Sequence, residues 1–174
     1  MSELSGKALH VTGGCQCGAI RYRAELDLAS AHLCHCRMCQ KAAGNSFMAL
    51  ASSPRAAFAV TRGTLATFKS SAGVARGFCR DCGTPLTFDI LASGQISVTL
   101  GSLDVPSAIV PVADCGTEAR MPWLAPLPAT RQDITEQGQP DGGARIAEVA
   151  ATNRQHPDRE TPQWLGSDPF AVGV

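Results

Sequence analysis

Apolar and polar residues alternate in several short runs between residues 11 and 123. Alternation with a period of two places one side of an extended chain in a core and the other side in solvent, so it predicts β-strands. Glycine, proline and serine separate the runs, as the turns of antiparallel sheets require. The pattern therefore predicts a mainly β fold. Its clearest runs are AIRYRAEL (Ala19 to Leu26), SFMALAS (Ser46 to Ser52) and QISVTLGSL (Gln95 to Leu103).

Two further pairs of runs flank predicted turns. PRAAFAV and TLATFKS lie on either side of Thr61-Arg62-Gly63, and they predict a strand pair around this turn. GVARGFC leads directly into a turn at Cys79, and PLTFDI leads out of it. The predicted strands thus continue from one end of this region to the other.

The character of the chain changes after Trp123, which we expect to anchor the core with its aromatic ring. Polar residues and prolines then interrupt every periodic pattern. We therefore predict one β domain over residues 1–125 and a Pro/Gly-rich appendage over residues 126–174. ARIAEVAATNR (Ala144 to Arg154) is expected to form a short amphipathic helix, and Trp164-Leu165 or Phe170 to dock the appendage on the core.

Charge and hydropathy exclude several classes of partner. Fifteen basic and fifteen acidic residues cancel, which argues against nucleic acid and against an anionic membrane surface. No apolar run approaches the roughly 20 residues that span a bilayer. The first 14 residues lack the apolar stretch of a signal peptide, so we expect the chain to be cytoplasmic.

The eight cysteines are the main candidates for chemistry, and in a reducing compartment they favour metal binding over disulfides. Cys15-Gln16-Cys17 is flanked by glycines that let the backbone turn tightly. Cys79-Arg80-Asp81-Cys82-Gly83 is a CxxCG turn, which places two thiolates on one metal. Together the two pairs supply four thiolates. A four-cysteine zinc has no open position, so this site is predicted to be structural.

Cys34-His35-Cys36-Arg37-Met38-Cys39 packs three thiolates into six residues. Three ligands leave a fourth position on a zinc ion vacant, which catalysis at zinc requires. Alternation along an extended segment points His35 away from the neighbouring sulfurs, so we do not expect it to be a ligand. Cys115 leaves two interpretations open. As a fourth thiolate it would close the site, and otherwise it is a free buried cysteine.

With these motifs placed, the chain resembles the glutathione-dependent formaldehyde-activating enzyme family. The resemblance extends from Gly14 to Trp123 and rests on GCQCGAIRY, CHCRMCQKAAGNSF, FCRDCGTPL, LGSLDVP and RMPW in this order. It implies a β-tent fold of several antiparallel sheets. It also implies two zinc ions per chain, a structural one on Cys15, Cys17, Cys79 and Cys82 and a reactive one on Cys34, Cys36 and Cys39.

The family's activity joins glutathione to formaldehyde as S-hydroxymethylglutathione, which in reverse is a carbon–sulfur lyase reaction. The resemblance therefore predicts a zinc-dependent lyase that acts on an adduct of glutathione, or another thiol, with formaldehyde or a related small aldehyde. Arg37, Lys41 and Arg76 could meet the carboxylates of glutathione, although isolated basic residues are more typically solvated surface.

The closing segment PVADCGTEARMPW departs from the family pattern. Asp114, Cys115 and Gly116 stand where the family commonly has a histidine, an aliphatic and an aromatic residue. The scaffold could thus have kept its fold and lost the chemistry, so a non-catalytic, zinc-stabilised binding or scaffold module is the alternative. Thiol redox chemistry is a third interpretation, and it is disfavoured because each cysteine pair has further cysteines placed to share a metal.

Overall fold

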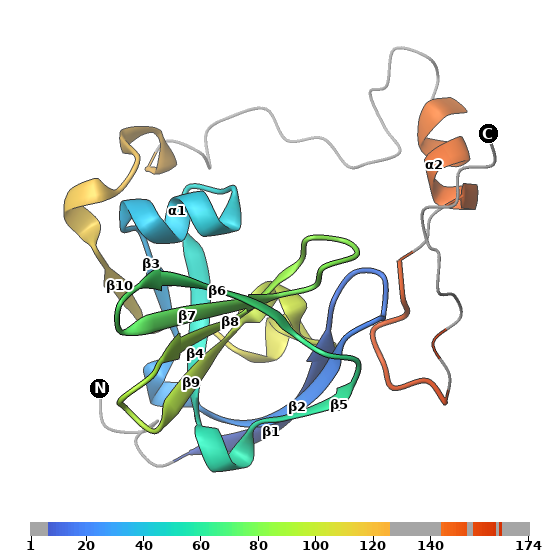
Figure 1. The fold of residues 1–174 in the computed structure, drawn as a ribbon. Helices are drawn as coiled ribbons and strands as arrows, with labels where there is room; N and C mark the ends of the chain where they lie inside the picture. Colours follow the sequence, from blue (N-terminus) through green and yellow to red (C-terminus); the bar gives the residue numbers. More distant parts are fainter. Residues whose placement is uncertain (1–6, 126–143, 153–154, 163, 165–174) are drawn as a thin grey trace.

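The computed structural model describes residues 7–125, 144–152, 155–162 and 164, and two β-sheets form its body (Figure 1). The first sheet has three strands, in the order β1 (Ala8–Gly14), β2 (Arg21–Asp27) and β5 (Ala59–Arg62). The second has seven, in the order β10 (Ala113–Cys115), β3 (His32–Cys34), β4 (Met48–Pro54), β9 (Gln95–Thr99), β8 (Pro85–Ile90), β7 (Val74–Phe78) and β6 (Ala66–Ser71). The mainly β prediction is confirmed.

Neighbouring strands pair antiparallel except at one edge of the larger sheet. There β10 runs parallel to β3, with Cys115 opposite Cys34 in the register. The sequence predicts neither of these three-residue strands, because they are too short to alternate visibly. Their pairing brings the closing segment next to the cysteine motif that begins at Cys34.

The core lies between the two sheets, where β2 packs against β4. Its largest fully buried side chains include Tyr22 and Leu26 on β2 and Val98 on β9. The Tyr22 hydroxyl shares a hydrogen bond of 2.7 Å with Ser102 Oγ, so this buried polar group is satisfied. The three clearest alternating runs correspond to β2, β4 and β9, as predicted.

The predicted strand pair around Thr61-Arg62-Gly63 is wrong. β5 pairs with β2 and β6 pairs with β7, so this turn carries the chain from one sheet to the other. Gly63 has φ 73°, and a Cβ there would lie 2.2 Å from the carbonyl oxygen of Ala19. The glycine is therefore needed for a close crossing between segments, and not for a hairpin turn.

Two α-helices are present among the described residues: α1 (Arg37–Ala43) and α2 (Ala144–Thr152). α1 packs on β4, and it ends at Gly44, whose φ of 59° gives a left-handed cap. The sequence analysis does not predict α1, because its first turn lies inside the cysteine motif. α2 corresponds to the helix expected in the appendage. None of the helices in the described ranges is long and apolar enough to cross a membrane.

Two expectations about tryptophan have opposite outcomes. Trp123 is 53% exposed in a short 3-10 helix at Pro122–Leu124, so its predicted place in the core is wrong. Trp164 packs against the core cluster, and its ring nitrogen donates to the carbonyl oxygen of Cys17 at 3.1 Å. Docking through Trp164 is thus confirmed, whereas Leu165 and Phe170 lie outside the described residues.

Candidate metal centres

Four cysteines from two distant turns meet at one point, and we call them the four-cysteine cluster. Cys15 and Cys17 lie in the turn between β1 and β2, and Cys79 and Cys82 lie between β7 and β8. Their four sulfurs all lie within 4.8 Å of one another, which is close enough to surround one metal ion. Four thiolates at this spacing suit a tetrahedral ion such as zinc.

The turns of this cluster direct hydrogen-bond donors at the sulfurs. The Ile20 amide donates to Cys15 Sγ at 3.2 Å, and the sulfur of Cys82 lies 3.1 Å from the Thr84 hydroxyl. Burial alone would raise the pKa of Cys82, but hydrogen bonds from Thr84 outweigh it and lower that pKa to about 7. Burial raises the pKa of Cys79 to about 11. A cation among the sulfurs would favour the thiolate form of both.

A C-terminal strap, residues 155–162, lies against the turn that carries Cys15 and Cys17 (Figure 1). The His156 amide donates to the carbonyl oxygen of Gln16 at 2.8 Å. The imidazole of His156 is buried, and a Cβ on Gly18 would lie only 2.2 Å from it. His156, which the sequence analysis gives no role, is therefore packed tightly beside the four-cysteine cluster.

The second group, which we call the three-cysteine cluster, comes from a single segment. Cys34 ends β3, Cys36 caps the start of α1, and Cys39 lies in its first turn. Their sulfurs lie within 4.8 Å of one another, and no other His, Cys, Asp or Glu in the described part of the chain joins them. Cys39 is 2% exposed, whereas Cys34 and Cys36 are half-buried. Three soft donors fit a zinc ion that keeps one position open.

Two thiols of this cluster, Cys34 and Cys36, differ in acidity. Burial and the neighbouring Cys39 raise the pKa of Cys34 to about 12. Burial also opposes ionisation of Cys36, but the nearby backbone amides of Cys39 and Met38, together with the Cys34 and Cys39 thiols, outweigh it and lower its pKa overall. These amides belong to the first turn of α1, where such donors have no partner within the helix. Cys36 is therefore more readily ionised than Cys34.

His35 and Cys115 both lie outside the three-cysteine cluster. His35 is buried, and its Nε2 lies 2.9 Å from Asp114 Oδ1, so it points away from the sulfurs as the sequence predicts. Cys115 is exposed, so it is neither the fourth ligand nor the buried cysteine of the two earlier interpretations. The backbone explains its position, because its carbonyl oxygen accepts the His35 amide at 2.8 Å while its side chain faces solvent.

The closing segment lies directly on the turn that holds Cys36. Asp114 bonds His35 on one side and Arg120 on the other, and these contacts lower the pKa of its carboxyl group. Gly116 has φ 64°, and a Cβ there would lie 2.8 Å from the Cys36 backbone nitrogen. An aromatic side chain would not fit at this position. The backbone of this segment therefore approaches the three-cysteine cluster closely at Gly116.

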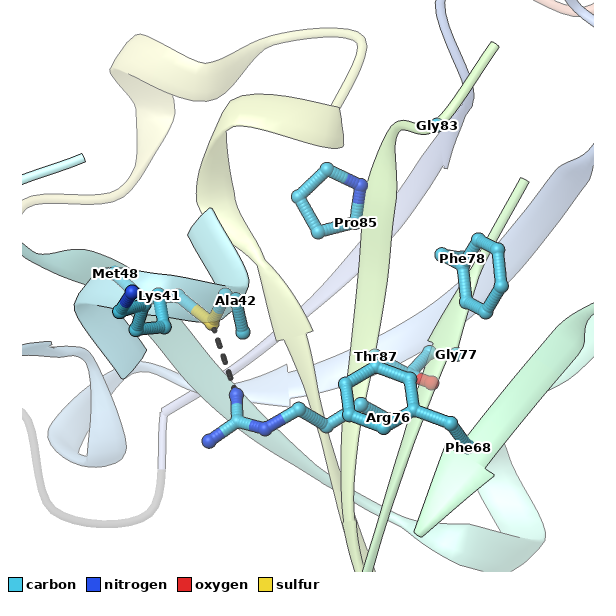
Figure 2. Close-up of a pocket in the computed structure, with 10 residues that line it drawn as sticks. All are labelled: Lys41, Ala42, Met48, Phe68, Arg76, Gly77, Phe78, Gly83, Pro85 and Thr87. Atoms are coloured by element: carbon cyan, nitrogen blue, oxygen red, sulfur yellow. Dashed lines mark hydrogen bonds between the residues drawn. The ribbon is translucent and has the colours of Figure 1, made fainter. Parts of the chain in front are cut away.

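A cavity of about 290 Å³ lies next to the three-cysteine cluster. Figure 2 shows Phe68 and Phe78 from β6 and β7 on one side and Met48 and Lys41 on the other. Arg76 lines the cavity and also lies 3.4 Å from Cys39 Sγ, so this side chain reaches from the cavity to the three-cysteine cluster. Only 4% of Arg76 is exposed, and the expectation that it is solvated is wrong. Arg37 and Lys41 are exposed as expected.

Together, the fold and the two clusters define a mainly β protein with two thiol sites suited to metal ions. The model of the glutathione-dependent formaldehyde-activating enzyme family matches residues 10–119, and the chain belongs to this family. The matched range contains all seven clustered cysteines.

A solved structure supports the fold. The chain is similar to a structural genomics target from Rhodobacter sphaeroides, with a TM-score of 0.51 and 24% sequence identity. The similarity covers 59% of this chain and 98% of the other. No functionally curated protein matches the chain. The match to the Rhodobacter protein bears on the architecture alone.

Proposed function

We propose that the protein is a zinc-dependent carbon–sulfur lyase that acts on a thiol adduct of formaldehyde or of a related small aldehyde, with glutathione as the expected thiol. In the cleavage direction, the C–S bond of the adduct breaks and its electron pair stays on sulfur. The adduct's hydroxyl proton is released, the carbonyl forms, and the thiolate takes up a proton. We place this reaction in a reducing cytoplasm, where both glutathione and free cysteines persist.

The observation that carries this proposal is the convergence of Cys34, Cys36 and Cys39 without a fourth side-chain donor among the described residues. A bound zinc ion with one open position would polarise the adduct's oxygen or stabilise its sulfur as a thiolate. Cys15, Cys17, Cys79 and Cys82 would hold a second zinc with no open position, and this zinc would be structural.

The protein's own contribution is to position the adduct. The cavity beside Cys39 is of the size of a small ligand site, and Phe68 and Phe78 give it apolar walls. Lys41 adds an exposed cation at its edge, which suits a carboxylate of a peptide-like thiol. Holding the thiol and the aldehyde in one place removes the entropic cost of bringing them together.

The test combines metal content with turnover, measured on the full chain. NMR exchange spectroscopy with formaldehyde and glutathione reports how much the protein accelerates formation and cleavage of the adduct. We expect about two zinc ions per chain, one of them removed by mild chelation with a parallel loss of the acceleration. A single, tightly held zinc and no acceleration would overturn the proposal.

Replacing Cys115 distinguishes an open site from a closed one. Because Cys115 is exposed and outside the cluster, Cys115→Ala should keep both metal ions and nearly full turnover. Metal analysis of the purified variant checks this directly. Loss of the second zinc in Cys115→Ala would mean that the thiol swings in to close the site, which would contradict the lyase.

The closing segment favours a second candidate function, a zinc-stabilised binding module without chemistry. Asp114 replaces the family's histidine, and it is held between His35 and Arg120. An acidic group so engaged contributes a surface contact more readily than a proton transfer. Under this alternative the protein binds two zinc ions, and neither their removal nor their return changes the rate of adduct exchange.

A further inference from the structure

Arg76 on β7 is a buried cation, and no carboxylate of the described residues neutralises it. Only 4% of the residue is exposed, and its Nε finds no hydrogen-bond partner in the part of the chain that the structure describes. None of the ion pairs found in the described ranges includes it. Arginine keeps its charge in proteins, so it cannot escape this burial by losing a proton. Burying a charge without a counter-charge costs desolvation free energy. An anion near the guanidinium would offset that cost.

The neighbours of the guanidinium show where that anion would be. Its Nη1 lies 3.6 Å from Met48 Sδ and its Nη2 lies 3.4 Å from Cys39 Sγ. Its carbon lies 4.8 Å from the centre of the Phe88 ring. A thioether and an aromatic ring are neutral. They partly offset the desolvation cost of a buried cation, but they do not neutralise its charge. Among these three groups, only the Cys39 sulfur can carry a full negative charge.

We propose that Arg76 is the counter-cation of a metal site on Cys34, Cys36 and Cys39. Three thiolates around a divalent ion carry a net charge of −1, and the guanidinium brings the whole assembly to neutrality. The contact to Cys39 also fixes this sulfur, so Arg76 is a positioning residue that acts through a ligand. The inference rests on the metal of the proposed function, and it does not depend on the lyase reaction.

Zinc affinity measured by competition with a chromogenic chelator tests this directly, with the four-cysteine cluster as an internal reference. Arg76→Met keeps an unbranched side chain and removes the charge, so it should weaken zinc binding at the three-cysteine cluster by about 10–100-fold. Arg76→Lys keeps the positive charge but lacks the planar guanidinium. Its zinc affinity should lie between that of the unchanged protein and that of Arg76→Met. Arg23→Met, at an exposed position on β2, is the matched control and should change neither site.

A double-mutant cycle distinguishes loss of the pairing between Arg76 and Cys39 from a general loss of stability. Cys39→Ala removes the anion, so adding Arg76→Met in this background should leave the melting temperature unchanged or raise it. In the zinc-loaded protein with Cys39 intact, the same change should lower it. If Arg76→Met does not fold, the same comparison is made with Arg76→Lys, which should then lower the melting temperature only where Cys39 is present.

Three results would overturn the inference. Arg76→Met could bind zinc at both sites as tightly as the unchanged protein, or it could shift the melting temperature equally in both backgrounds. It could also keep its zinc affinity and lose only affinity for glutathione, in which case Arg76 serves the cavity. An affinity change without any turnover in the unchanged protein would support Arg76 and contradict the lyase. Failure of the unchanged protein to bind a second zinc would contradict both.

Discussion

At the scale of single residues, Gly116 sets how closely the closing segment approaches the three-cysteine cluster. Its backbone is left-handed, and the space where a side chain would begin is occupied by the Cys36 backbone. Gly44 at the end of α1 has a similar φ of 59°, and apart from its immediate neighbours in the chain, no described residue lies within 4 Å of the place that a Cβ would take there. A substitution at Gly44 therefore measures the free-energy cost of a left-handed backbone alone. The same substitution at Gly116 adds the cost of the contact with Cys36.

We expect Gly44→Ala to lower the free energy of unfolding by about 1–2 kcal/mol, the cost of a left-handed alanine. Gly116→Ala should cost more, because it also pushes against Cys36. It should in addition loosen metal binding at the three-cysteine cluster, which Gly44→Ala leaves unchanged. Denaturant unfolding and metal titration measure the two effects. Equal costs and equal metal affinities for the two variants would show that the close approach is unimportant.

The sequence predicts residues well where spacing carries the chemistry. The two cysteine groups are separable from their spacing, because CxxC and CxC turns aim sulfurs at one point in any fold. Arg76 and Trp123 are assigned to the wrong environments, since burial depends on neighbours that are distant in the sequence. Arg76 is covered by Met48 and by Phe88, from two other strands. No local pattern indicates those contacts.

At the scale of elements, the C-terminal strap lies against the smaller sheet and the turn beside the four-cysteine cluster. Arg62 on β5 donates to the Thr161 carbonyl and hydroxyl oxygens, and Arg21 on β2 pairs with Glu160 at 3.2 Å. The His156 ring also lies 2.9 Å from the Thr161 hydroxyl. The strap is thus held at two strands of the smaller sheet and at the cysteine turn.

The strap should loosen in mild acid. Burial, together with the nearby charges of Arg21 and Arg62, lowers the pKa of His156 below its ordinary value of 6.5, while Asp104 opposes this. A lowered histidine pKa means that its stabilisation is complete above 6.5 and is lost as the pH falls below that value. The protection factor of the His156 amide, which compares its exchange with the intrinsic rate, should therefore fall by as much as tenfold per pH unit below about 6.5.

His156→Gln is the matched control, because glutamine can still hydrogen-bond but cannot take up a proton in this range. In this variant the extra pH dependence of exchange over the strap should disappear. Exchange in the strap that is equally pH-dependent in both proteins would mean that another group titrates there.

Longer strands are easier to predict from the sequence than shorter ones. β2, β4 and β9 are found because each alternates over five or more residues. β3 and β10 have three residues each and are missed. The pairing of β5 and β6 is mistaken because alternation marks a buried face without naming the partner strand. Only the close contact between Gly63 and Ala19 explains why the chain changes sheets there.

At the scale of the whole molecule, the two clusters have different relations to the fold. The four-cysteine cluster links the β1–β2 turn of the smaller sheet to the β7–β8 turn of the larger one. Cys17 and Cys79, in contact across this cluster, are 62 residues apart in the chain. The three-cysteine cluster links only residues of one short segment. A metal ion in the first cluster would therefore hold the sheets together, and one in the second would not.

Removing one ligand from each cluster should separate these roles. A cross-link over 62 residues contributes on the order of 4 kcal/mol through the entropy of the unfolded chain. Cys82→Ala should thus lose one zinc and unfold at a much lower temperature. Cys36→Ala should also lose one zinc but melt within a few degrees of the unchanged protein. Calorimetry with metal analysis compares them, and similar melting temperatures for the two variants would refute this division of roles.

The central claim is that one cluster is complete within the protein and the other accepts a ligand from outside. Cadmium NMR of the protein loaded with cadmium in place of zinc tests this most directly, because the chemical shift reports how many thiolates bind each ion. The account predicts two signals, one from four thiolates and one from three, with only the second moving when glutathione is added. A single signal, or two signals that both ignore glutathione, would contradict it.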